Sequence, residues 1–145
     1  MTITMLRAKL HRLRVTDANL YYQGSITIDE ELLDAAGLLP YEKVQVVNVN
    51  NGSRLETYTI PGEAGERTVC LNGAAARLAE VGDEVIVIAY AEMTAQEAQQ
   101  HHPRVVHVDA DNDVTRTRTL DVAGEEPDLA PDGMEDVLIA ESEPK

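Results

Sequence analysis

The chain has 145 residues, 43% of them hydrophobic, and a formal net charge of −14 at pH 7. This length predicts one domain with its own core, and so strong a negative charge argues against nucleic-acid binding, which depends on neutralising phosphates. No apolar run approaches the ~20 residues of a membrane span, and the basic start lacks the apolar segment of a signal peptide, so we expect a cytoplasmic protein without membrane contact.

The first third of the chain predicts strands and one helix. Residues 5–15 alternate between apolar and basic side chains, as a half-buried strand does, and "TDAN" at 16–19 then predicts a turn. Residues 20–28, "LYYQGSITI", indicate a strand interrupted at Gly24. Residues 29–39 predict a short helix with Asp29 as its amino-terminal cap and Gly37 at its carboxyl end.

The middle of the chain predicts mostly strands. We expect residues 43–49 and 55–60 to form a hairpin around Asn51-Gly52. Residues 66–71 predict a further strand, with Cys70 as a small buried residue. Residues 72–83 predict one or two helical turns, 84–93 a long central strand, 94–97 a capping box and 104–109 a last strand. The expected fold is mainly β and closed, because an open sheet this apolar would expose its edges.

Charge is distributed unevenly along the chain. Residues 110–145 carry 11 acidic and 3 basic side chains and contain Pro and Gly, so we expect the domain to end at residue 113 and residues 114–145 to form a disordered acidic tail. The first 14 residues instead hold four cations and no acid. They form either a solvated strand face or a group that meets an anion: Arg7, Lys9, Arg12 and Arg14.

No ordinary catalytic motif is present. The histidines and the single cysteine lack the spacing of a zinc site, so no metal is expected, and no nucleophile elbow, P-loop or dinucleotide fingerprint occurs. In "NGAAAR" at 72–77, the backbone N–H groups of Gly73, Ala74 and Ala75 could cradle a carboxylate or an oxyanion. Asn72 can cap this short helix, and a plain helix start packed under alanines is the favoured interpretation of these residues alone.

Three segments together resemble the aspartate 1-decarboxylase family: "KLHRLRVTDANLYYQGSITIDEELLDAAGL", "NGSRLETYTI" and "NGAAARLAEVGDEVIVIAYA". The resemblance runs from about Met5 to Asp113, and the order and spacing of the motifs make it specific. It implies a double-psi β-barrel with short helices, assembled as a homotetramer with sites between protomers. The implied reaction is pyruvoyl-dependent decarboxylation of L-aspartate to β-alanine for pantothenate biosynthesis.

The resemblance also implies that the chain is made as a proenzyme. It would cleave itself between Gly24 and Ser25 into residues 1–24 and 25–145, and Ser25 would become a covalent pyruvoyl group. That group would form a Schiff base with the amine of aspartate. Thr57 would stabilise the oxyanion of cleavage, and Tyr22 and His11 would support the cleavage site.

Further family roles map onto residues of this chain. Lys9 and Arg54 would hold the substrate carboxylates, Thr57 would contact substrate and Tyr58 would donate a proton to its Cα. Asn72 and the backbone of Gly73, Ala74 and Ala75 would line the pocket. In a strand, Thr57 and Tyr58 face opposite sides, so both can reach one site only at a bend or between subunits.

Two alternatives remain open at this stage. The chain could be a non-catalytic β-barrel or swapped-hairpin module, or it could apply pyruvoyl chemistry to another small amino acid such as glutamate. Some family members use an accessory maturation factor, and the sequence identifies no docking surface for one.

Overall fold

The computed structural model describes residues 1–120 as a mainly β fold with short helices, which confirms the expected fold class. Its elements in chain order are β1 (Thr2–Arg14), β2 (Asp17–Asn19), β3 (Ser25–Asp29), α1 (Glu30–Ala36), β4 (Lys43–Asn48), β5 (Arg54–Gly62), β6 (Val69–Asn72), the 3₁₀ helix η1 (Gly73–Leu78), β7 (Glu84–Thr94), α2 (Ala95–Gln100), β8 (Arg104–Val108) and β9 (Val114–Thr119).

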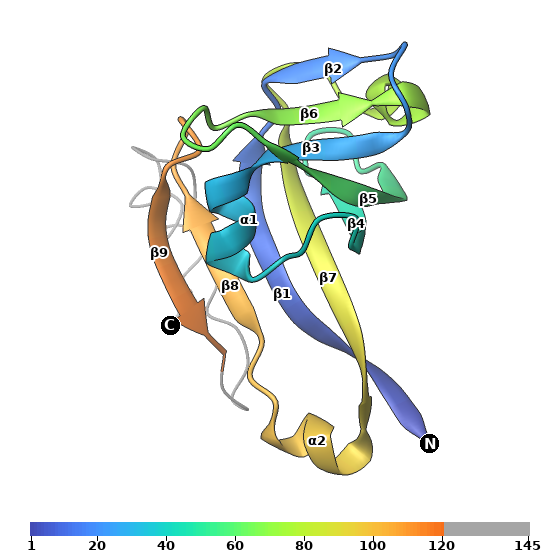
Figure 1. Ribbon diagram of the computed structural model, residues 1–145, viewed down its shortest axis with the longest axis vertical. Helices are drawn as coiled ribbons and strands as arrows, with labels where there is room; N and C mark the ends of the chain where they lie inside the picture. The colour runs from blue at the N-terminus through green and yellow to red at the C-terminus, as the bar shows by residue number, and fades with distance from the viewer. Residues whose placement is uncertain (121–145) are drawn as a thin grey trace, which may run out of the picture.

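The nine strands of residues 1–120 form one sheet in the order β2-β6-β3-β5-β4-β7-β1-β8-β9. Strands β1 and β7 form a long antiparallel ribbon, and β2, β6 and β3 run across it at one end of the molecule (Figure 1). Strand β5 joins the two halves, because residues 54–58 pair with β4 and residues 59–62 pair with β3. The sheet is therefore strongly bent and barrel-like.

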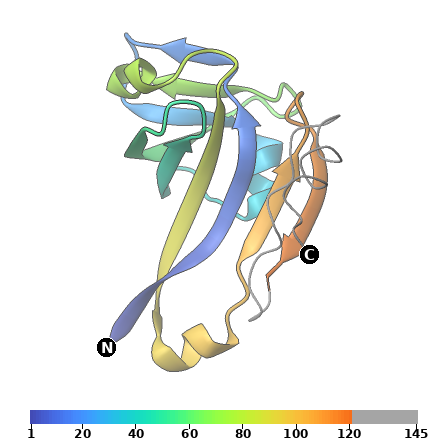
Figure 2. The same cartoon turned by 180° about the vertical axis from the view of Figure 1, so that it is seen from behind.

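The core is aliphatic, as the absence of Phe and Trp requires. Helix α1 packs on one face of the sheet through its buried residues, Leu32, Leu33 and Ala36. Figure 2 shows β1, β7 and β8 from the other face, turned away from α1. The sheet thus has an inner face toward the core and α1, and an outer face.

The predictions from local sequence signals are confirmed. Asp29 Oδ1 accepts a hydrogen bond from Glu31 N at 2.7 Å, and Gly37 ends α1 with a φ of 75°. Thr94 and Glu97 form the predicted capping box of α2, and β4 and β5 pair as the predicted hairpin.

Several expected boundaries are wrong, because long-range pairing decides them. Asp17–Asn19, expected to be a turn, forms β2 because β6 runs parallel beside it, and the strand expected from residue 20 begins only at Ser25. Residues 104–108 are not the last strand: Val114–Thr119, expected in the tail, forms β9 along the edge of β8. The remaining tail prediction, for residues 121–145, lies outside the described residues.

Within residues 1–120, no helix has both the length and the apolar character that a membrane span demands.

Candidate active site

Ser25 is fully buried at the start of β3, between β5 and β6. Its Oγ accepts a hydrogen bond from Asn72 Nδ2 at 2.9 Å and donates one to the carbonyl oxygen of Gln23 at 3.1 Å. Both partners of the hydroxyl are thus fixed. The sequence-predicted pair of Ser25 and Asn72 is brought into direct contact.

The Asn72 carboxamide, which is 2% exposed, has a partner for each polar atom. Its Nδ2 also donates to Thr27 Oγ1 at 2.9 Å, and its Oδ1 lies 3.2 Å from Cys70 Sγ, which donates to it. The expected capping role of this side chain is wrong, because it makes no cap hydrogen bond to η1. The acceptors on β3 hold the side chain over the sheet instead.

Cys70 and Thr27 were not identified as site residues from the sequence. Strand alternation carried a usable signal, since residue 70 shares a face with 72, and residue 27 shares one with 25. The expectation that Cys70 is buried is also wrong: it is only partly buried, beside the short edge strand β2. Burial and the nearby charge of Asp17 raise the pKa of its thiol, so the thiol stays protonated and can donate to Asn72.

Gly73 lies against the backbone of the predicted scissile segment. A Cβ at Gly73 would stand 2.8 Å from Gly24 Cα, Gly24 N and the carbonyl oxygen of Tyr22, and Gly73 has a φ of 67°. Only glycine fits there without displacing backbone. Of its predicted neighbours, Ala74 is exposed and Ala75 packs partly against the core.

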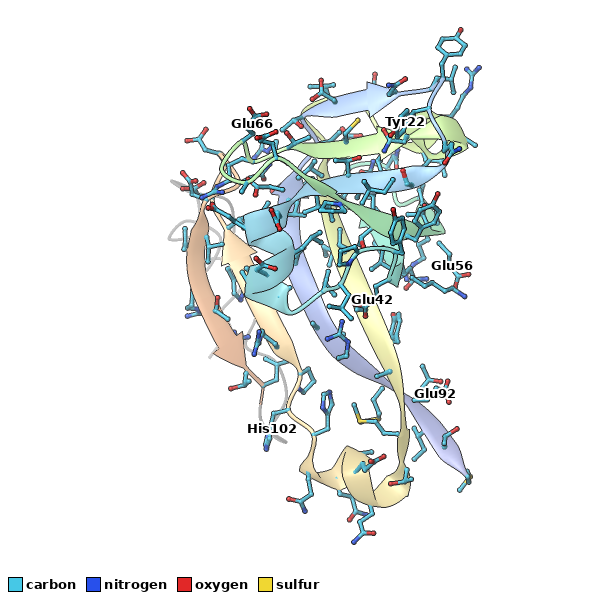
Figure 3. The ribbon with its side chains drawn as sticks, viewed as in Figure 1. Tyr22, Glu42, Glu56, Glu66, Glu92 and His102 are labelled. Carbon is cyan, nitrogen blue, oxygen red and sulfur yellow. The ribbon has the colours of Figure 1, made fainter. Side chains whose placement is uncertain are left out.

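The side chain of Tyr22 is 55% exposed and lies beside the end of β6 and η1, whereas Glu92 and His102 lie at the opposite end of the molecule (Figure 3). The predicted cleavage segment therefore runs along one end of the sheet.

Tyr58 is the next predicted residue that the fold places near Ser25. Ile26 pairs with Thr59 in parallel strands, so Ser25 and Tyr58 occupy the preceding positions on neighbouring strands and share the outer face. The ring centroid of Tyr58 lies 6.2 Å from that of Tyr41. Thr57 turns to the opposite face, as strand alternation predicts.

Arg54 and Lys9 share the outer face with Tyr58 but lie farther from Ser25. Arg54 is exposed and donates from Nη1 to Gln45 Oε1 at 3.2 Å. Gln45 pairs with Ile88 and Ile88 pairs with Lys9, so Lys9 lies on the same face of the sheet as Gln45. Lys9 stands four strand steps from Ser25, about 19 Å along the sheet at about 4.8 Å per step. The strand order of one chain therefore does not place Lys9 beside Ser25.

His11 is likewise on β1, far from the predicted scissile bond. It is 4% exposed, and its ring meets that of His107 on β8 edge to face with centroids 5.3 Å apart. Within one chain, its strand position does not place it beside Gly24 and Ser25.

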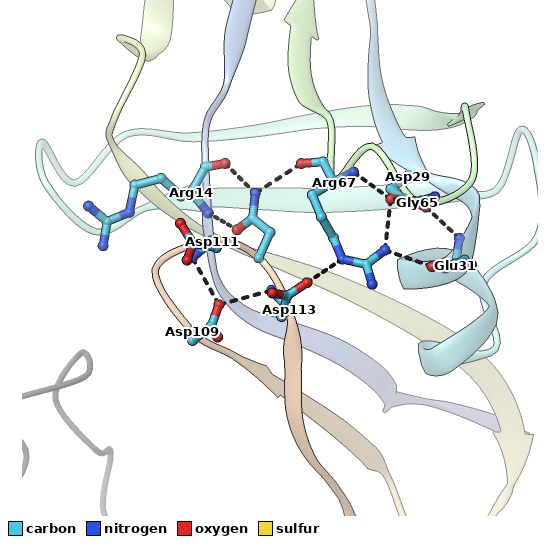
Figure 4. A network of polar contacts seen from close by, with 9 residues as sticks. Arg14, Asp29, Glu31, Gly65, Arg67, Asp109, Asp111 and Asp113 are labelled. Carbon is cyan, nitrogen blue, oxygen red and sulfur yellow. Dashed lines mark hydrogen bonds and ion pairs between the residues drawn. The ribbon is translucent and has the colours of Figure 1, made fainter.

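A polar network fixes the opposite end of β3 (Figure 4). The buried carboxylate of Asp29 accepts hydrogen bonds from the backbone N–H groups of Glu31, Gly65 and Arg67, and from Arg67 Nη1 at 3.0 Å. Arg67 also donates to Glu31 and Asp113. Burial alone would raise the pKa of Asp29, but these hydrogen bonds outweigh it and the pKa is lowered.

Comparison with known proteins gives a consistent result. A family model described as aspartate decarboxylase matches residues 1–115. The chain is 84% identical to the aspartate 1-decarboxylase of Salinibacter ruber over 142 residues, which cover 97% of each chain. It is 59% identical to the protein of the same name from Carboxydothermus hydrogenoformans, over 86% of this chain and 98% of that relative, and 56% identical to that from Bacillus licheniformis, over 86% and 94%.

Proposed function

The chain belongs to the aspartate decarboxylase family and is a carboxy-lyase of that family, and from this premise we propose that it converts L-aspartate to β-alanine and carbon dioxide with a pyruvoyl group made from Ser25. β-Alanine would then enter pantothenate biosynthesis. The observation that supports this proposal most is the cluster of Asn72, Gly73 and Ser25 around the Gly24–Ser25 bond.

The proposed maturation uses the Ser25 hydroxyl as a nucleophile. Oγ attacks the carbonyl carbon of Gly24, the C–N bond breaks, and the hydroxyl proton ends on the freed amine. Loss of the Ser25 α-proton and cleavage of the Cβ–Oγ bond then release a chain that ends in the Gly24 carboxylate and leave dehydroalanine at residue 25. Hydrolysis of the resulting dehydroalanine releases ammonia and leaves the pyruvoyl group at residue 25.

The residues present fit this chemistry. Asn72 holds Oγ in place, and the lack of a side chain at Gly73 lets residues 22–24 pass close to η1. The Thr57 hydroxyl would stabilise the oxyanion that forms on Gly24, a role in which fixed donors are effective. Burial of Ser25 keeps water away from the ester until elimination.

In the mature protein, a pyruvoyl group held at residue 25 would supply an electrophilic carbonyl for the substrate amine and an electron sink for decarboxylation. The Tyr58 phenol would deliver a proton to the substrate Cα, since it lies on the strand beside residue 25. The Asn72–Ala75 segment would line the pocket, and Thr57, on the opposite face of β5 from Tyr58, would join it at a bend or between subunits. Lys9 and the guanidinium of Arg54 would bind the two carboxylates.

We propose assembly as a homotetramer, and the distance of Lys9 from Ser25 supports a site shared between copies of the chain. Strands β5, β4 and β7 lie between Lys9 and Ser25 in the sheet, a path of about 19 Å, so the strand order of one chain does not place the two residues side by side around one aspartate. Lys9, Arg54 and Tyr58 all face outward, so a second copy could bring its Lys9 to residue 25 of the first. We propose that each site forms between neighbouring protomers.

Intact mass spectrometry tests the proposal. The purified protein should resolve into residues 1–24 and 25–145, the larger with a blocked amino terminus, and should release β-alanine from L-aspartate. Ser25→Ala should abolish both, whereas the matched variant Ser53→Ala, whose hydroxyl donates to the Leu78 carbonyl, should abolish neither. A full-length chain that forms no β-alanine after long incubation would contradict the proposal, and faster turnover of glutamate would correct the substrate.

A further inference from the structure

The outer face of β1, β8 and β9 carries a set of basic side chains. The parallel register pairs Lys9 with Val105 and His11 with His107, and the antiparallel register pairs Val105 with Arg118 and His107 with Arg116. Residues paired in this way point to the same side of a sheet. We call the exposed and partly exposed members of this set the basic face: Lys9, His107, Arg116 and Arg118, with His11 buried among them.

The core side chains confirm which way the basic face points. Leu10 and Val106, which alternate with its members, belong to the hydrophobic core on the inner face. The basic face is therefore the side of these strands turned away from α1, the view in Figure 2.

The chain that follows β9 is strongly acidic. Residues 121–145 contain nine Asp and Glu residues and one Lys. The segment begins beside the basic face, because Leu120 N donates to the Pro103 carbonyl at 2.8 Å and Val105, two residues on, pairs with both Lys9 and Arg118. Twenty-five residues have a contour length of about 80 Å, several times the width of three strands.

We propose that the acidic segment of residues 121–145 binds the basic face of this chain and competes there with the dianionic substrate for Lys9. Charge complementarity and covalent continuity both favour this occupant over an external anion. A tethered segment binds at a high effective concentration, so even a weak contact is well populated. The segment would act as an internal competitor that lowers the apparent affinity for aspartate.

Binding and competition are separate parts of this inference. Binding rests on the register and the charges alone, whereas competition also rests on the proposed function, through the role of Lys9 in holding a substrate carboxylate. The two parts therefore need different measurements.

Binding is tested with a fluorescein-labelled peptide of residues 121–145. The recipient is the full chain in which all nine acidic residues of the segment are replaced by Asn or Gln. Fluorescence anisotropy should detect binding that weakens as ionic strength rises from about 50 to about 300 mM. The double variant Arg116→Gln and Arg118→Gln, made in that recipient, should raise the Kd about fivefold or more, since each lost cation weakens binding by about threefold.

A matched double variant separates this result from a simple loss of net charge. Lys43→Gln with Arg77→Gln also removes two exposed cations but lies outside β1, β8 and β9. It should leave the peptide Kd within about twofold. Equal peptide binding by the Arg116/Arg118 variant and by this control would overturn the proposal.

Competition is tested by steady-state kinetics on fully processed protein. Replacing the nine acidic residues by amides should lower KM for L-aspartate about three- to tenfold and leave kcat unchanged, since only a competing ground-state contact is removed. The peptide added in trans should restore the higher KM. An unchanged KM would overturn the proposed competition. A protein that neither cleaves itself nor makes β-alanine would contradict the proposed function, and the anisotropy result on binding would still hold.

A second copy of the chain is the other occupant to test. Sedimentation velocity on the Arg116/Arg118 variant should give the oligomeric state of the wild type. A change in that state without a change in peptide affinity would place Arg116 and Arg118 in an interface between copies and overturn the inference.

Discussion

Asn72 Nδ2 donates a hydrogen bond to Ser25 Oγ at 2.9 Å, across the pair of strands β3 and β6. Because the Oγ accepts there, its own hydrogen is directed to the Gln23 carbonyl. The amide therefore fixes both the position of the nucleophile and the direction in which its proton leaves. Maturation should depend on this contact more than folding does.

Replacing Asn72 with Ala should slow self-cleavage by about five- to thirtyfold, because a buried hydrogen bond of this kind contributes about 1–2 kcal/mol. The measurement is the first-order rate of conversion of freshly purified proenzyme, followed by intact mass. Asn51→Ala is the matched control, since the amide of Asn51, in the β4–β5 hairpin, donates to the carbonyl of Leu78 in η1. Equal cleavage rates in the two variants would show that Asn72 has no role in positioning Ser25.

Cys70 should act as a positioning residue through Asn72. Its thiol donates to Asn72 Oδ1 and so sets which end of the amide faces Ser25. Cys70→Ala should slow cleavage about threefold, since a thiol is a weak donor, and Cys70→Ser, which restores a donor, should recover the rate. Both variants should keep the urea midpoint of the wild type, and a loss of midpoint that parallels the loss of rate would mean that Cys70 only stabilises the fold.

Gly73→Ala should nearly abolish self-cleavage by pushing the Tyr22–Gly24 backbone away from η1. The added Cβ would stand 2.8 Å from three backbone atoms of that segment. Gly52→Ala is an unusually close control, because Gly52 has a similar φ of 76° but nothing within 4 Å of the added Cβ. Both variants should lose about 1 kcal/mol of stability from backbone strain, and only Gly73→Ala should lose cleavage. A slow Gly52→Ala variant would assign the effect to strain alone.

Sequence patterns anticipated those features whose causes are local. The Asp29 and Gly37 caps, the Thr94–Glu97 capping box and the Asn51-Gly52 hairpin each depend on residues within a few positions of one another. Strands β2 and β9 were not anticipated, because they exist only where β6 and β8 offer an edge to pair with. An edge of that kind is a tertiary property with no local signature.

The candidate site divides in the same way. The resemblance supplied Ser25, Asn72 and Gly73, and the fold brings them into contact. Cys70 and Thr27 became visible only when the register of β3 and β6 placed them around the Asn72 amide. The Asn72 amide bonds to side chains of both β3 and β6 and not to η1, so the capping role expected for Asn72 is wrong.

Tyr58→Phe should separate turnover from maturation. Loss of the phenol hydroxyl should lower kcat about 100-fold or more, as loss of a general acid does, and leave self-cleavage within about twofold. The readouts are β-alanine release and intact mass on the same preparation. Tyr41→Phe keeps the ring that faces Tyr58 and should retain kcat, so equal kcat losses in the two variants would exclude Tyr58 as the proton donor.

Asp29 should make the fold sensitive to acid. Its folded-state pKa lies below its unfolded value of about 3.9, so the carboxylate stabilises the fold above that value, and this stability is lost as the pH falls through the folded pKa. Asp29→Asn should therefore lower the free energy of unfolding by about 2–4 kcal/mol at pH 7 and flatten its decline between about pH 5 and pH 3. The free energy of unfolding is measured by urea titration in the Ser25→Ala background, where the chain stays uncleaved in every variant. Asp34→Asn, an exposed change in the helix that Asp29 caps, should shift the unfolding free energy by less than about 0.5 kcal/mol. If the Asp29→Asn variant loses stability with falling pH as steeply as the Asp29 protein does, other carboxylates govern the acid sensitivity.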